Sequence, residues 1–174
     1  MLVYNHMTWC RAVFLLCVVV ATSAFTPQPA KERQAQDKLP QSKDELWGVF
    51  GKCKLTLDPK TAMYSIAFTP EVNAMEGKPF TVSGFMLPLE SKEKFTHYLL
   101  SKRTPTCPFC PPGLPNEIVE VFSKKAVTWD SDIVVVTGTM LLSSDPEKGL
   151  FFQMKDGEQM EIKPYETPRM VPVD

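Results

Sequence analysis

Histidine is the scarcest chemically reactive residue in this chain of 174 residues, which contains only His6 and His97. The sequence also has no nucleophile elbow, no phosphate-binding glycine loop and no paired-histidine zinc motif. If His6 is removed with an N-terminal export signal, a serine–histidine hydrolase would have a single histidine to work with. These absences argue against an enzyme.

An excess of positive charge is missing as well. The chain has 19 basic and 20 acidic residues, and its formal net charge is −1. A chain without an excess of basic residues has no net positive charge to attract nucleic acid or anionic lipid, so neither is an expected partner. Single-strand binders stack bases on exposed aromatic residues, but without a basic groove the aromatic residues here are interpreted mainly as core: Trp47, Phe85, Phe109, Trp129, Phe151 and Phe152.

Charge is nearly absent from the N-terminus, where Arg11 is the only charged residue among the first thirty. An apolar run over 12–21 follows it, and small residues at 22–24 offer a cleavage point before Phe25. The run is shorter than the ~20 apolar residues of a membrane-spanning helix, so residues 1–24 are predicted to be a signal peptide. The predicted location is the periplasm or the extracellular space. The alternative is an uncleaved N-terminus that tethers the protein to a membrane.

The rest of the chain is predicted to form one domain. Removal of 24 residues from 174 leaves 150, enough to bury a core without help from disulfides. Residues 25–43 are rich in Pro, Gln, Lys and Ala and are predicted to be a flexible linker. A single β-barrel-like domain is expected over 44–160, followed by a proline-rich tail over 161–174.

Short β-rich runs separated by turn formers dominate the predicted domain. They lie at 63–69, 80–87, 95–101, 118–123, 133–142 and 150–154. The third run is ambiguous, because Phe95, Tyr98 and Leu99 would also line one face of a short helix. The class is all-β with either assignment, with room for a short N-terminal helix.

Two of the runs carry a glycine in the middle of an otherwise apolar strand, at Gly84 and Gly138. Glycine there permits a bulge or a sharp bend, and bent strands suit a small closed barrel better than a flat sandwich. The alternative is that two unrelated strands have glycine at closely packed positions. The predicted architecture is a five- to six-stranded barrel of the oligonucleotide/oligosaccharide-binding (OB) kind.

The most distinctive motif is the cysteine pair Cys107 and Cys110, separated by Pro108 and Phe109. Two cysteines at this spacing can hold one zinc ion through both thiolates, and Cys53 and His97 are candidates to complete a tetrahedral shell. The first competing interpretation is a disulfide, because an exported protein meets an oxidising environment. For His97, a half-buried ring with a hydrogen bond is the competing interpretation.

Thiol–disulfide exchange is a third possible role for the pair. It requires a helix N-terminus to lower the pKa of the first thiol, as in thioredoxin-like enzymes. The segment 111–115, Pro-Pro-Gly-Leu-Pro, would break such a helix as soon as it began. A redox catalyst is therefore disfavoured.

Several sequence blocks occur together in a characteristic order. They are Val82–Leu89 (VSGFMLPL), Cys107–Cys110 (CPFC), Ile118–Val121 (IVEV) and Val136–Met140 (VTGTM). In this order the chain resembles the bacterial exported family catalogued as domain of unknown function 3299, over roughly 46–154. The resemblance implies an exported β-domain protein without an established reaction, and only Cys107 and Cys110 match its cysteine block. Some members look like neighbours of transport systems that respond to zinc, which implies a metal-related accessory role.

The sequence thus leads to one main hypothesis and two alternatives. The main hypothesis is an exported binding protein, accessory to an envelope metal-handling or transport system, whose Cys107–Cys110 loop holds zinc or contacts a transport protein. The first alternative is a non-catalytic interaction module in which the pair forms a disulfide. The second is a thiol–disulfide redox protein.

Overall fold

The computed structural model describes residues 37–105 and 113–160. The chain divides into two compact units, Met1–Lys38 and Leu39–Asp174, and the helices and strands below belong to the second. The predicted signal peptide, most of the predicted linker, the cysteine pair and the predicted tail lie outside the described residues.

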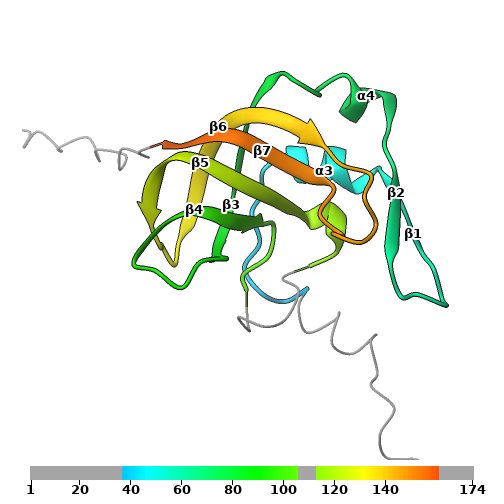
Figure 1. Ribbon diagram of the computed structural model, residues 1–174, viewed down its shortest axis with the longest axis horizontal. Helices are drawn as coiled ribbons and strands as arrows, with labels where there is room; N and C mark the ends of the chain where they lie inside the picture. The colour runs from blue at the N-terminus through cyan, green and yellow to red at the C-terminus, as the bar shows by residue number, and fades with distance from the viewer. Residues whose placement is uncertain (1–36, 106–112, 161–174) are drawn as a thin grey trace, which may run out of the picture. The chain divides into compact units, whose positions relative to one another are not determined.

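The described part of the second unit consists of seven strands and three short helices (Figure 1). In chain order these are α3 Leu46–Gly51, β1 Lys54–Leu57, β2 Tyr64–Ala67, α4 Pro70–Asn73, β3 Pro79–Pro88, β4 Lys94–Ser101, the 3-10 helix η1 Pro115–Glu117, β5 Ile118–Thr128, β6 Ile133–Leu142 and β7 Phe152–Met160. None of these helices has the length and apolarity that a membrane crossing requires.

Five strands form a closed barrel in the order β3-β4-β5-β7-β6, with β6 pairing back onto β3. All neighbours are antiparallel except β5 and β7, which are parallel. The prediction of an all-β, OB-like barrel is confirmed, and so is the short N-terminal helix, which is α3. The ambiguous third run is a strand, β4.

The first predicted run, 63–69, lies outside the barrel. Its central part is β2, which pairs with β1 in a separate two-stranded hairpin, while its last residue, Thr69, caps α4 by accepting from the Val72 amide. The strand β1 was not predicted; within it Leu55 is partly buried against the core, whereas Leu57 is 49% exposed.

The barrel interior is filled by alternate side chains of its strands. In β5, for example, Val119 and Val121 are fully buried in the core. Helix α3 adds two large aromatic groups: Phe50 stacks on Phe152 with ring centroids 4.4 Å apart, and the Trp47 indole N–H donates to the Ser83 carbonyl over 2.8 Å. The start of the folded unit is thereby fixed to two barrel strands.

Asp44 ties the chain ahead of α3 to β3. One carboxylate oxygen accepts from the Leu46 amide at 3.0 Å, and the other accepts from the Ser83 amide at 2.8 Å. With both carboxylate oxygens bound to backbone amides, Asp44 acts as a turn and capping residue.

The two mid-strand glycines lie where other chain segments come close. A Cβ on Gly84 would lie 2.7 Å from the Ser101 carbonyl oxygen, and one on Gly138 would lie 2.8 Å from that of Lys155. Gly138 also coincides with a register shift between β6 and β7, next to the Met154 side chain. Close approach therefore explains both glycines, and at Gly138 a strand irregularity accompanies it.

Candidate functional site

The β4–β5 connection, which contains the cysteine pair, begins and ends at a buried ion pair. Arg103, two residues after β4, donates from Nε to Glu117 Oε2 over 3.1 Å and from a terminal guanidinium nitrogen to Glu117 Oε1 over 3.0 Å. Arg103 is 5% exposed and Glu117 is 7% exposed. We call this pair the loop clamp, because it joins the chain just before the loop to the chain just after it.

Backbone contacts reinforce the loop clamp. The Leu114 amide donates to Glu117 Oε2 over 3.1 Å, and the Lys102 amide donates to the Glu117 carbonyl over 3.0 Å. A Cβ on Gly113 would lie 2.9 Å from Glu117 Oε2, so glycine lets the returning loop pass close to the carboxylate. On the other side, the Thr104 hydroxyl donates to the Pro40 carbonyl over 2.9 Å.

One buried polar atom beside the loop clamp has no partner among the residues that the structure describes. Asn116 in η1 is 7% exposed, and its Oδ1 accepts no hydrogen bond from them. A buried acceptor of this kind normally finds a water or a ligand donor. At the end of the barrel where the cysteine loop begins, the Asn116 Oδ1 is therefore a buried acceptor without a hydrogen-bond donor among the described residues.

The four predicted site residues are found in different surroundings. Cys107 and Cys110 lie outside the described residues, between Pro105 and Gly113. Cys53 is a free cysteine, 3% exposed, and belongs to the hydrophobic core cluster together with Trp47 and Phe50.

His97 lies on β4, on the outer side of the barrel. Its Nε2 is 2.8 Å from Glu120 Oε1, and its ring stacks on Phe122 with centroids 4.5 Å apart and planes 12° apart. The side-chain amide of Gln153 donates from Nε2 to the other carboxylate oxygen of Glu120, Oε2, over 2.7 Å. With 34% of its side chain exposed, His97 has the half-buried, hydrogen-bonded environment that was the competing interpretation.

The zinc shell of four residues stays a prediction, because two of its members lie outside the described residues. Within 37–105 and 113–160, no group of three or more His, Cys, Asp or Glu is placed to hold a metal ion. His97 also lies six residues ahead of Arg103, which is about 20 Å along an extended strand. Any shared site would need the loop to turn back along β4.

Sequence reasoning missed Arg103, Glu117 and Glu120 as residues of interest. Glu120 could have been found from the sequence, because it is the one charged residue inside the apolar run Ile118–Val121. Charged residues are rarely buried without a partner, so a glutamate in such a run indicates a polar contact on the outer barrel face. For Arg103 and Glu117, no pattern in the sequence pairs one with the other.

Glu90, in the β3–β4 turn, supports the backbone of His97. Its Oε1 accepts from the amides of Thr96 and His97, each over 3.0 Å, and its Oε2 pairs with Lys92 over 2.9 Å. The hydrogen bond from Lys92, followed by those from Thr96 and His97, lowers the pKa of Glu90 from 4.5 to about 2.

The lowered pKa of Glu90 predicts an acid-dependent change in stability. Because the folded pKa is depressed, the stabilisation from this carboxylate is full above pH 4.5 and is lost as the pH falls through about 2. We expect Glu90→Gln to remove this part of the acid sensitivity, measured as the unfolding midpoint between pH 5 and 2. An NMR titration that gives Glu90 an ordinary carboxyl pKa would contradict the prediction.

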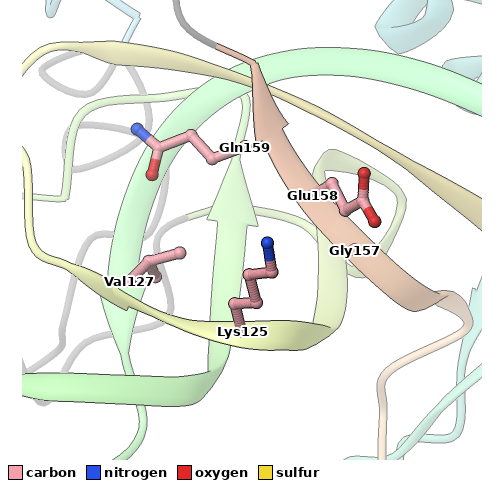
Figure 2. A pocket seen from close by; sticks show the side chains of 5 residues that line it. All are labelled: Lys125, Val127, Gly157, Glu158 and Gln159. Atoms are coloured by element: carbon pink, nitrogen blue, oxygen red, sulfur yellow. The ribbon is translucent and has the colours of Figure 1, made fainter.

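A pocket of about 250 Å³ lies between β5 and β7 (Figure 2). It is lined by Lys125 and Val127 of β5 and by Gly157, Glu158 and Gln159 of β7. Lys124 pairs with Glu158 over 3.1 Å beside it, and the hydrogen bond that Lys124 donates to the Glu158 carboxylate raises the pKa of Lys124. The pocket is smaller than the ~300–1,000 Å³ usual for small-molecule sites.

Comparison with known proteins gives a family and a structural neighbour. The family described as "Protein of unknown function (DUF3299)" matches residues 24–155. A similar solved structure is the crystal structure of a DUF3299 family protein from Pseudomonas aeruginosa PAO1, whose sequence is 25% identical to this one. The match covers 56% of this chain and 69% of that protein, with a TM-score of 0.42. No curated protein matches the chain.

Proposed function

The chain belongs to the DUF3299 family, and from that premise we propose that it is an exported binding protein whose site is the Cys107–Cys110 loop between β4 and β5. Its ligand is zinc, held by the two thiolates, and its role is that of an accessory to an envelope transport system. The protein performs no reaction of its own.

The loop clamp is the observation that carries this proposal. Removing two charges from water has a large desolvation cost, and a buried ion pair often adds little net stability. A fold that nevertheless buries Arg103 and Glu117 holds the chain before the loop and the chain after it in fixed positions. Fixed ends reduce the entropy lost when the loop orders around a ligand, which raises affinity.

The proposed ligand set is narrower than the predicted shell of four residues. Cys53 is left out, because its thiol lies among aromatic core residues where a zinc ion would have to displace packed side chains. His97 is retained as a candidate third ligand, because Glu120 and Phe122 orient its ring. Zinc-binding histidines commonly donate their other ring N–H to a carboxylate.

Native mass spectrometry of the mature protein, purified without added reductant, tests the proposal. We expect one zinc ion per chain, lost on denaturation, after which Cys107 and Cys110 both react with an alkylating reagent. Replacement of either cysteine by serine is expected to lower the zinc affinity at least ~100-fold, because a two-thiolate chelate becomes a single ligand.

The matched control is Cys53→Ser, which also removes one thiol and is expected to leave zinc stoichiometry unchanged. His97→Ala then reports whether this histidine is a third ligand. A mass two hydrogens light with no metal would contradict the proposal and establish the disulfide alternative. A strongly depressed thiol pKa at Cys107 would instead favour the redox alternative.

A further inference from the structure

The parallel pair β5 and β7 separates partway along the barrel. The two strands pair from Glu120 to Ser123 on β5 and from Gln153 to Gly157 on β7. Beyond that point, in the described part of the chain, β5 pairs only with β4 and β7 pairs only with β6. We call the two facing edges, residues 124–128 of β5 and 158–160 of β7, the open seam.

Backbone irregularities on both strands keep the seam from closing. On β5, residues 123–126 are opposed by Thr96 alone, between the Phe95–Val127 and His97–Phe122 pairs. On β7, Asp156 has a φ of 56° in the left-handed region, and the register with β5 shifts there. Bulges bend a strand and end its pairing, and they concentrate near functional sites.

The pocket between β5 and β7 lies in the open seam. Figure 2 shows Lys125 and Val127 on one side of it and Gly157, Glu158 and Gln159 on the other. Its volume of about 250 Å³ is below the ~300–1,000 Å³ typical of small-molecule sites, so it suits a side chain better than a cofactor.

The charges along the seam favour an acidic side chain. Lys124 is already paired with Glu158 over 3.1 Å, and that contact joins the two strands by side chains in place of a backbone hydrogen bond. Lys125, the pocket residue next to it, forms no ion pair with any residue that the structure describes. An incoming carboxylate would therefore meet the Lys125 ammonium group, while the Glu158 carboxylate in the same pocket is already paired with Lys124.

Apolar side chains are exposed at the same end of the barrel. Trp129 follows β5 and is 56% exposed, Ile133 begins β6 and is 36% exposed, and Met160 ends β7 and is 50% exposed. Exposed apolar residues gathered beside an unpaired strand edge are typical of an interaction surface.

We propose that the open seam binds an extended peptide segment of a partner protein, which adds as a strand between β5 and β7. The two peptide side chains that face the pocket lie two positions apart, one acidic and one apolar, so that a carboxylate lies against Lys125 and an apolar group against Val127. Main-chain hydrogen bonds to an exposed edge supply the affinity, and the alternate side chains supply the specificity. This surface is separate from the proposed zinc loop.

Fluorescence anisotropy with a labelled heptapeptide whose even positions are Glu, Val and Glu and whose odd positions are Thr tests the proposal on the full chain, because the glutamates and the valine then share one face of the strand. We expect saturable binding that weakens about five- to tenfold in Lys125→Glu, the size expected when an exposed ion pair becomes a repulsive pair. Lys60→Glu, in the β1–β2 turn, makes the same change of net charge far along the chain from the seam and is expected to leave the affinity unchanged.

A second peptide of the same sequence, N-methylated at alternate amides, separates strand addition from mere charge attraction. It is expected not to bind, because it cannot donate to the strand edge. Equal binding of the two peptides, or no saturable binding of either, would overturn the proposal. A dimer in sedimentation that Lys125→Glu dissociates would assign the seam to a second copy. Binding gained only on removal of 161–174 would assign it to this chain's own C-terminal segment.

Discussion

Arg103→Met is expected to lower the free energy of unfolding by about 3–5 kcal/mol, more than any other substitution proposed for this protein. The substitution keeps the unbranched alkyl part of the side chain but removes both hydrogen bonds to Glu117, which is 7% exposed. Glu117 then loses its closest cationic partner and keeps the Lys102 ammonium 3.8 Å away, so the loss comes mostly from the poorly compensated desolvation of its buried charge and only in part from the missing contact.

Urea unfolding followed by tryptophan fluorescence measures this loss, and the double variant Arg103→Met/Glu117→Leu identifies its cause. With both charges removed, most of the stability should return, since an apolar pair of similar volume has no desolvation cost. The recovery is expected to be incomplete, because the Leu114 amide loses its acceptor. If the double variant is as unstable as the single one, the buried charge is not the cause.

The double variant also connects the loop clamp to the proposed function. Its fold should persist while the ends of the cysteine loop are no longer held by the ion pair. If the clamp pre-organises the loop, the zinc affinity of the double variant falls although Cys107 and Cys110 are unchanged. Unchanged affinity would mean that the clamp serves stability alone.

Gly138→Ala is the second large effect, with an expected loss of about 3 kcal/mol from overpacking. A Cβ there would lie 2.5 Å from Met154 Cγ and 2.8 Å from the Lys155 carbonyl oxygen. The methionine side chain can turn away, but the carbonyl belongs to β7, which is paired with β6 at this point. The contact between the new methyl group and the Lys155 carbonyl oxygen can therefore be relieved only if β6 and β7 move apart.

The matched control is Gly48→Ala, in α3, where nothing lies within 4 Å of the added Cβ. Alanine is favoured over glycine in a helix by about 1 kcal/mol, so this variant is expected to be more stable than the natural protein. The same urea series measures both variants. A Gly138→Ala protein as stable as the natural one would show that the barrel relaxes around the new methyl group.

The strands of the barrel could be predicted from the sequence because their signals are local. Alternating apolar residues between turn formers predicted β3 to β7, and the mid-strand glycines predicted bent strands in a small barrel, although the close approach of neighbouring strands that the structure shows at both glycines was only the alternative. The run at 63–69 also forms a strand, β2, but its pairing with β1 outside the barrel could not be predicted, because a local pattern indicates that a strand forms and not which sheet it joins.

Partners of charged and sulfur-bearing residues were decided only by the tertiary structure. Arg103 and Glu117 meet across fourteen positions, and Glu120 meets His97 and Gln153 on different strands. The sequence around these residues does not distinguish paired, buried charges from exposed ones. The same is true of Cys53, whose burial in the core follows from the docking of α3 against β7.

The sequence by itself determined the fold class, the strands of the barrel and the cysteine motif, because each follows from residue type and short-range spacing. The tertiary structure alone decided that the cysteine loop begins and ends at a buried ion pair, that Cys53 is a core residue, and that β5 and β7 separate at an open seam. These features depend on the register of strands distant in the sequence, which is fixed only when the whole barrel closes.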